Sequence, residues 1–177
     1  ALALNGGTIK DAAGNAATLT LASPGASNSL GNNKALVVDT TVPTVSSVTS
    51  STANGTFKVG DAISIQVNFS ESVTVTGTPQ LTLETGGTDA VVDYASGSGG
   101  AALTFTYTVA GGHTSADLDY ASTSALALNS GTIKDAAGNA ATLTLASVGA
   151  SNSLGNNKAL VVDGTVPTVS SVTSSTA

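Results

Sequence analysis

Carboxylate side chains are the residues of this sequence with the clearest capacity for chemistry. The 177 residues include eleven Asp and Glu against five Lys, which gives a net charge of −6. Asp39, Glu71 and Asp135 lie in three separate segments, and an asparagine follows the last of them by four residues. If the fold brings these side chains together, the carboxylates repel one another unless a cation binds between them. Hard oxygen ligands suit Ca²⁺. The candidate metal ligands are therefore Asp39, Glu71, Asp135 and Asn139.

A second interpretation of the same residues needs no metal. The run DAAGN at 135–139 has the composition of a hairpin turn, where Asp, Gly and Asn are favoured for their backbone preferences. Asp39 can simply end a strand. The same turn recurs at Asp11 and Asn15. A further group of aspartates is expected at the opposite end of the domain, near the next junction: Asp61, Asp117, Asp119 and Asp163.

Catalytic arrangements find little support in the sequence. The single histidine, His113, lies in the turn GGHTS at 111–115, and a Ser-His-Asp site needs a histidine that packing holds beside its nucleophile. We expect His113 to be a solvated loop residue. The absence of cysteine removes thiolate catalysis, thiolate metal sites and disulfides together. The sequence therefore predicts that the protein is not an enzyme.

Composition argues against two further classes of protein, those that bind nucleic acid and those that span a membrane. Charged residues make up 9% of the chain, against roughly 25% in typical globular domains. The acidic balance and the lack of arginine remove the electrostatic term that drives nucleic-acid binding. Apolar residues come in short runs, never in the stretch of about 18 that a membrane helix needs. Neither nucleic acid nor insertion of this segment into a membrane is expected.

An internal repeat organises the chain. Residues 1–53 return as residues 125–177 and differ at three of the 53 positions, which defines a period of 124 residues. The differing pairs are Gly6 and Ser130, Pro24 and Val148, and Thr40 and Gly164. A period of this length corresponds to one whole domain. We expect the C-terminal part of a preceding repeat at 1–39, a complete repeat at 40–163 and the first strand of a following repeat at 164–177, in a chain that is a piece of a longer one.

Alternation of apolar and polar residues predicts the strands that position the candidate site. It is strict over 63–69 and 103–109. Weaker strands are expected at 44–50, 80–84, 90–94, 118–128 with a break, 141–145 and 158–163. Short strands, frequent turns and little sign of helix predict an all-β, immunoglobulin-like antiparallel sandwich. In such a fold the leading linker with Asp39, the end of the 63–69 strand with Glu71, and the 135–139 turn share one end.

Several segments resemble the bacterial Ig-like repeats of giant extracellular adhesins: VDTTVPTVSSV, VGDAISIQVNFSESVTVTGTPQLTL, LTFTYTVAGG and GTIKDAAGNAA. The resemblance covers the whole complete repeat. It implies tandem extracellular or cell-surface domains that extend an adhesive tip or build biofilm matrix, and that calcium commonly stiffens.

The leading hypothesis is a structural extender module whose partners are neighbouring copies of the repeat. Near-identical copies suit a role in which number and spacing matter. One alternative is a carbohydrate- or ligand-binding accessory module of a secreted protein, although such modules usually expose aromatic residues. Another is a filament subunit that self-assembles into fibres by strand exchange. The two flanks together lack counterparts of the central strands, so exchange between flanks alone does not complete a domain.

Overall fold

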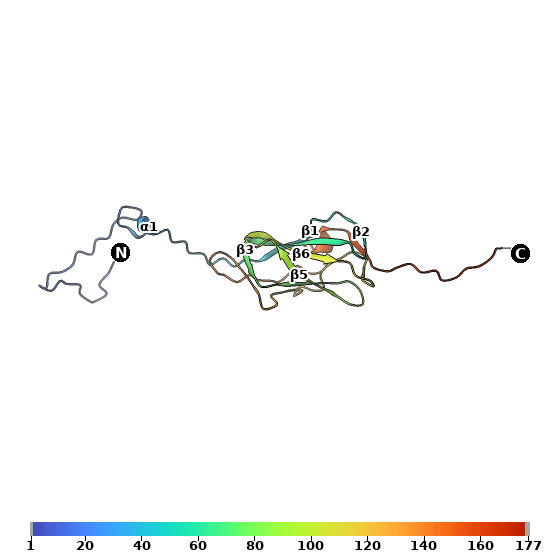
Figure 1. The fold of residues 1–177 in the computed structure, drawn as a ribbon. Coiled ribbons are helices and arrows are strands. Elements are labelled where there is room, and N and C mark those ends of the chain that lie inside the picture. The colour runs from blue at the N-terminus through green and yellow to red at the C-terminus, as the bar shows by residue number, and fades with distance from the viewer. Residues whose placement is uncertain (1, 176–177) are drawn as a thin grey trace. The chain divides into compact units, whose positions relative to one another are not determined.

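The computed structural model describes residues 2–175, which divide into two units (Figure 1). The first unit runs up to Asp39. Within its described residues the regular structure is α1 (Leu30–Asn33) and an isolated bridge between Lys10 and Ala16. The second unit begins at Thr40 and contains the strands.

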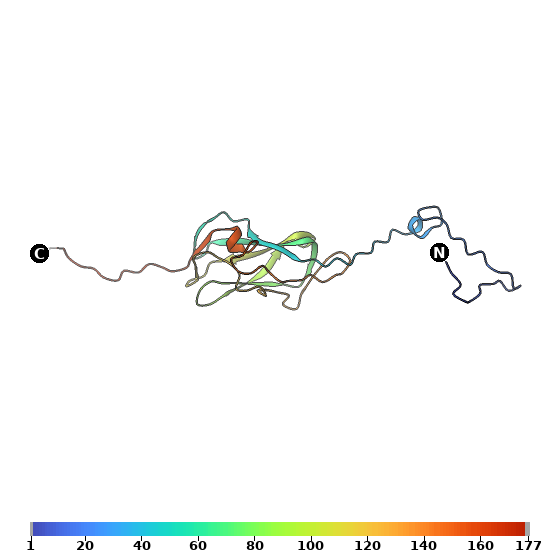
Figure 2. The same cartoon turned by 180° about the vertical axis from the view of Figure 1, so that it is seen from behind.

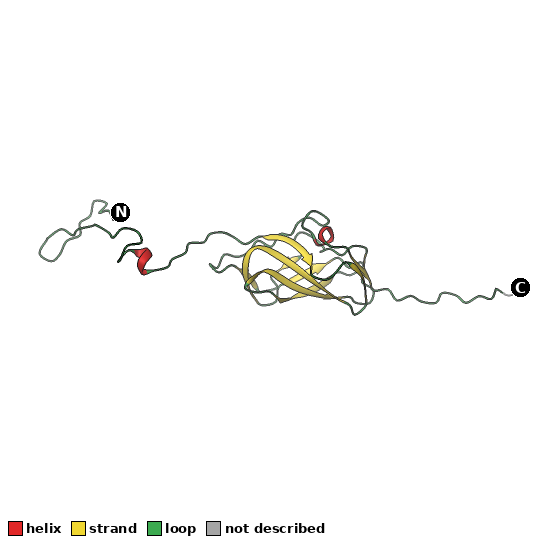
Figure 3. Cartoon of the chain, turned by 90° about the horizontal axis from the view of Figure 1, so that it is seen from above, coloured by secondary structure: helices red, strands yellow, loops and turns green. Residues whose placement is uncertain are grey.

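The strands of the second unit form two sheets (Figure 3). The larger sheet has the order β1-β3-β6-β5-β4-β8, with β9 also paired to β3, and the smaller has the order β2-β10-β7. Their bounds are β1 (Val45–Ser50), β2 (Gly55–Lys58), β3 (Ala62–Thr76), β4 (Gln80–Leu83), β5 (Ala90–Ser96), β6 (Gly100–Thr108), β7 (Thr114–Ser115), β8 (Leu126–Ala127), β9 (Thr132–Lys134) and β10 (Leu160–Asp163). The fold is all-β, and its strand pairs are antiparallel except for β2 with β10.

The core comes from the two strongly alternating strands. The first half of β3 pairs with β6, from Ala62 opposite Thr108 to Asn68 opposite Ala102. Their inward-facing side chains are buried, including Phe69, Phe105 and Tyr107. Side chains from β1, β4, β9 and β10 join the same cluster. The core that the alternation predicts is therefore confirmed.

Strand β3 differs from the sequence expectation in a way that bears on the site. It continues through Ser70 and Glu71 to Thr76, so the prediction that Glu71 follows the end of a strand is wrong. Its pairing with β6 shifts register between Asn68 and Val73. A bulge of this kind bends a strand without ending it. The second half of β3 can then leave β6 and pair with β9.

Other elements differ because tertiary contacts, rather than local patterns, create them. Strand β7 forms within the 111–115 turn, and β2 forms where no strand was expected, since both pair with β10. Of the strand expected at 118–128, only β8 and a bridge at Tyr120 form. The strand expected at 141–145 is reduced to a bridge between Thr44 and Thr142.

Two four-residue helices, α1 and α2 (Leu154–Asn157), occur among residues 2–175 where little helix was expected. Each begins at a serine whose hydroxyl accepts a backbone N–H three residues later, Ser29 in the first unit and Ser153 in the second. A serine at this position satisfies one of the free N–H groups of a helix start. Helix α2 lies beside β1 (Figure 2). Nδ2 of Asn157 donates to the carbonyl of Val48 (2.8 Å). No helix in the described part of the chain is long and apolar enough to cross a membrane.

The segment that leaves β10 is held against a loop of the same unit. The N–H of Gly164 donates to the carbonyl of His113 (2.7 Å), and the N–H of Gly112 donates to the carbonyl of Gly164 (3.0 Å). A side chain at position 164 has no room, because its Cβ would overlap the carbonyl oxygen of Ala110 and lie 2.7 Å from that of His113. The corresponding residue of the first repeat copy is Thr40.

Candidate metal centre

Three of the four candidate ligands come together. One carboxylate oxygen each from Asp39, Glu71 and Asp135 lies within 4.8 Å of the other two. Asp39 directly precedes Thr40, Glu71 lies in β3 beyond the bulge, and Asp135 follows the last residue of β9. The antiparallel pairing of β3 with β9 explains part of this arrangement. It sets Lys134 opposite Thr74, so Asp135 continues toward Glu71.

The linker after Asp39 is tied to the same region by backbone contacts. The N–H of Thr44 donates to Oγ of Ser70 (3.0 Å), and the N–H of Ser70 donates to the carbonyl of Thr44 (2.8 Å). The N–H of Thr142 donates to the carbonyl of Pro43 (2.8 Å). These bonds hold the start of the second unit between β3 and the segment after β9.

Asp135 is fixed by the turn that it begins. Its Oδ1 accepts the backbone N–H of Asn139 (2.8 Å), and its Oδ2 accepts Nδ2 of the same residue (2.7 Å). Burial by itself raises the pKa of Asp135, but the hydrogen bonds from Asn139 and the neighbouring backbone outweigh it and hold the pKa below its usual value. The side chain is therefore ionised at neutral pH.

Asn139 connects the turn to the linker. Its Nδ2 also donates to the carbonyl of Thr41 (3.1 Å), two residues after Asp39. These contacts give the amide nitrogen a positioning role between Asp135 and the linker. Metal ligation by Asn139 stays a prediction.

The first unit supplies an internal comparison for this turn. Oδ1 of Asp11 accepts the N–H of Asn15 (2.8 Å), and its Oδ2 accepts Nδ2 of Asn15 (2.9 Å). The turn thus forms from its own sequence, without the contacts of the complete repeat. What distinguishes Asp135 is the pair of carboxylates from distant segments, and that convergence depends on the tertiary structure.

The aspartates expected at the other end have contacts of their own. Asp119 is buried, and its carboxylate accepts the N–H groups of Tyr120, Gly149 and Leu154. The carboxylate of Asp61 accepts the backbone N–H of Lys58 (3.0 Å) and forms an ion pair with the Lys58 side chain (3.0 Å), and these contacts lower the pKa of Asp61. Asp163 accepts the N–H of Thr165, and Asp117 lines an open pocket with Asp119. These contacts hold loops in place. The burial of Asp119 was not expected from the sequence.

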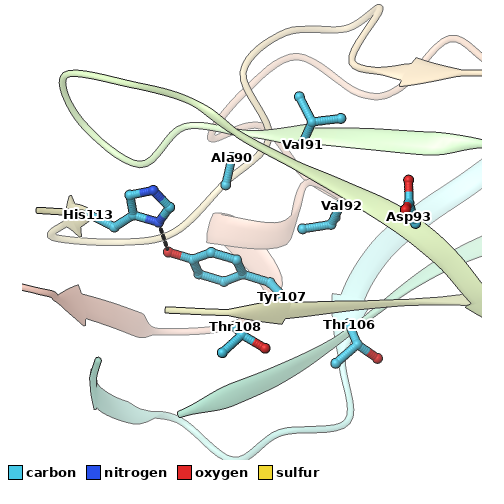
Figure 4. A pocket seen from close by; sticks show the side chains of 8 residues that line it. All are labelled: Ala90, Val91, Val92, Asp93, Thr106, Tyr107, Thr108 and His113. Atoms are coloured by element: carbon cyan, nitrogen blue, oxygen red, sulfur yellow. Dashed lines mark hydrogen bonds between the residues drawn. The ribbon is translucent and has the colours of Figure 1, made fainter. Parts of the chain in front are cut away.

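His113 is more constrained than expected. It is half-buried, Nδ1 lies 2.8 Å from the hydroxyl of Tyr107, and the two rings stack (Figure 4). Burial raises the pKa of Tyr107, so its hydroxyl is protonated at neutral pH. Asp93 and Thr106 line the same pocket. The expectation of a solvated histidine is wrong, because the loop that carries it folds back over β6.

Comparison with known protein families agrees with this architecture. A family model described as bacterial Ig-like domain matches residues 39–151, a range that contains all four candidate ligands. The chain belongs to the bacterial Ig-like domain family. Domains of this family are typically non-catalytic structural modules, found in bacterial surface proteins. No match was found among curated proteins or among solved structures.

Proposed function

We propose that this bacterial Ig-like chain is an extender module of an extracellular adhesin or fibre, and that Ca²⁺ held by Asp39, Glu71 and Asp135 stiffens the start of each repeat. The observation that carries the calcium part is the convergence of three carboxylates within 4.8 Å. One of them belongs to the linker, so a cation bound here ties the linker to β3 and to the turn after β9.

Electrostatics support a cation at this position. Glu71 has a carboxylate oxygen that is buried from solvent, and Asp135 is almost fully buried. Carboxylates that share a buried site repel one another, and a divalent cation removes that repulsion. Ca²⁺ takes six to eight oxygen ligands, which backbone carbonyls and water complete in flexible sites. Asn139 would orient Asp135 and the Thr41 carbonyl around the ion.

The extender role follows from repetition. Two nearly identical copies at a period of 124 residues suit a protein whose length is set by repeat number. Neighbouring domains joined by a short linker move relative to each other unless something restrains them. Extracellular modules often bind Ca²⁺ with dissociation constants of about 10⁻⁴ to 10⁻³ M, so such a site fills outside the cell and not in the cytosol.

The carbohydrate-binding alternative gains no support from the aromatic residues. Phe69, Phe105, Tyr107 and Tyr120 are buried and unavailable for stacking on a sugar, and Phe57 and Tyr94 are partly buried and pack against the core.

Thermal unfolding of the full chain in calcium and in chelator tests the metal site. At free Ca²⁺ ten times the dissociation constant, one site adds about 1.4 kcal/mol to the free energy of unfolding, or roughly 5 °C in Tm. Glu71→Gln is expected to abolish the shift, while Glu84→Gln, outside the cluster, keeps it. Equal melting in the two buffers would refute calcium binding and leave the extender role standing.

Scattering from arrays of one, two and four repeats tests the extender role separately. The maximum dimension is expected to rise in proportion to repeat number in calcium. In chelator the arrays of the same length are expected to be more compact, because the linkers bend. Collapse of the arrays into a compact particle in both buffers would contradict the extender role.

A further inference from the structure

The last strand of the complete repeat is held one residue beyond its end. Strand β10 pairs with β7 as far as Asp163, which lies opposite Thr114. Gly164 then continues this contact, because its N–H donates to the carbonyl of His113 (2.7 Å) and its carbonyl accepts the N–H of Gly112 (3.0 Å). Gly164 is also buried. The chain is therefore fixed at the point where it leaves the repeat.

The 110–113 loop that receives Gly164 is itself fixed to the core. The loop closes with the N–H of His113 on the carbonyl of Ala110 (3.2 Å). Nδ1 of His113 is hydrogen-bonded to the hydroxyl of Tyr107 (2.8 Å), and the two rings stack (Figure 4). Tyr107 belongs to β6 and is buried. The contact at the exit is thus connected to the core through two side chains.

Space at position 164 restricts the residue that can make this contact. A Cβ there would overlap the carbonyl oxygen of Ala110, and would lie 2.7 Å from the carbonyl oxygen and 3.0 Å from the nitrogen of His113. All three neighbours are backbone atoms, which cannot rotate aside as a side chain can. The residue 124 positions earlier in the sequence is Thr40. A threonine with the backbone conformation of Gly164 would overlap the loop.

We infer that Tyr107, His113 and Gly164 form an exit anchor, which fixes the direction in which the chain leaves the repeat, and that the residue at position 164 decides whether the anchor forms. With glycine, the free linker begins after residue 164. With threonine, as at position 40, the same loop cannot accept the residue, and the chain is released at Asp163. The anchor is a property of a single repeat, so it depends neither on the calcium site nor on the extender role.

The anchor reverses what the sequence alone predicts for this position. Glycine has more backbone freedom than any other residue, so a free glycine after a strand acts as a flexible point in the chain. Gly164 is instead held by two hydrogen bonds, and a side chain at the same position breaks both. The exit with glycine is therefore the ordered one, and the exit with threonine is the flexible one.

Spin-label distances in the full chain distinguish these opposite expectations. The chain has no cysteine, so labels can be placed at Thr74→Cys, exposed in β3, and at Thr165→Cys, directly after the anchor. We expect a narrow distance distribution with Gly164, and a broader one with Gly164→Ala and with Gly164→Thr. A distribution that is unchanged or narrower in both variants overturns the inference, since a free glycine predicts narrowing.

Two controls accompany these distances. Thr40→Gly makes the converse change at the matched position and should leave the distribution unchanged. Amide exchange in β3 and β6 should stay slow in the Gly164 variants, which shows that broadening comes from the exit and not from unfolding of the repeat.

Amide hydrogen exchange at residue 164 tests the link to the core. Tyr107→Phe removes the hydroxyl that bonds His113 and keeps the ring, so the amide of Gly164 is expected to exchange about tenfold faster. Tyr94→Phe, which removes a hydroxyl that accepts the N–H of Ser98, is the matched control and should leave this amide unchanged. Equal exchange at residue 164 in Tyr107→Phe and in the unaltered chain overturns the anchoring role of Tyr107 and His113.

Discussion

At the scale of single residues, buried carboxylates act by organising backbone N–H groups. Asp119 joins three such groups from two loops, and Asp135 closes the turn beside the candidate metal centre. Charge-assisted hydrogen bonds of this kind are stronger than neutral ones, and their loss leaves buried donors unsatisfied. The acidic residues are few, and two of them have structural roles that need no metal.

Asp119→Ala is expected to lower the free energy of unfolding by about 2–4 kcal/mol, because Gly149 and Leu154 lose their acceptor. Asp117→Ala, an exposed neighbour that lines the same pocket, is the control and should change stability by less than about 0.5 kcal/mol. Urea unfolding followed by circular dichroism measures both. Equal effects from the two variants would contradict an anchoring role for Asp119.

The lowered pKa of Asp135 predicts an acid-sensitive repeat. Its stabilising contribution is complete above the pKa of the unfolded state, close to 4, and is lost as pH falls through the lower pKa of the folded state. The free energy of unfolding, measured in chelator, should therefore decline below about pH 4. Asp135→Asn should flatten this decline, whereas Asp11→Asn, in the equivalent turn of the first unit, should leave it unchanged. An equal decline in Asp135→Asn would show that other groups cause it.

At the scale of elements, pairing partners decide what a segment becomes. Residues of β2 and β7 are extended because they pair with β10. The bulge in β3 allows this one strand to pair with both β6 and β9. The chain after β10 is likewise held by the 110–113 loop through Gly164. The path of the chain after β10 thus depends on the backbone hydrogen bonds between position 164 and the 110–113 loop, which glycine permits.

Gly164→Thr is expected to destabilise the second unit by about 1–3 kcal/mol, since its side chain forces the segment off the loop and breaks two backbone hydrogen bonds. The reverse change at the matched position, Thr40→Gly, should alter stability by less than about 0.5 kcal/mol in chelator. Thermal unfolding and the NMR shifts of Gly112 and His113 report the result. Unchanged shifts in Gly164→Thr would show that the loop accommodates the side chain.

At the scale of the whole molecule, two nearly identical segments have different structures. Residues 125–163 form β8, β9 and β10, which pair with other strands of the second unit, whereas no strand forms among the described residues 2–39. The core of the second unit draws on strands separated by up to about a hundred residues, such as β2 with β10. Local sequence is enough for the turn and the short helix, which appear in both copies. It is insufficient for the strands, which appear in one.

Amide hydrogen exchange should therefore separate the two segments. Residues 126–162 are expected to be protected to a level close to the global stability, and residues 2–38 to exchange at nearly unprotected rates. Peptides that span Pro24 and Val148 can be told apart by mass, so each acts as the control for the other. Comparable protection in both would contradict the exposure of residues 2–38.

The sequence by itself determined the features that depend on residues close together in the chain. Alternation over 63–69 and 103–109 predicted β3, β6 and their buried face, and the DAAGN turn needed only its own side chains. The quoted segments indicated the Ig-like family, which the family match confirms. The three carboxylates were also named together from sequence, because the ends of an Ig-like sandwich are known once its strands are.

Tertiary structure decided the rest, for reasons of pairing and space. Strand β3 runs past Glu71 because β9 offers its later residues a second partner. His113 is bonded to Tyr107 because its loop folds over β6, and position 164 requires glycine because three backbone atoms crowd it. Each of these depends on atoms distant in sequence, whose approach no local pattern encodes. Leu160 is buried and its counterpart Leu36 is exposed, although the sequences around them are the same. Burial therefore depends on which other strands lie against a residue, and local sequence does not determine this.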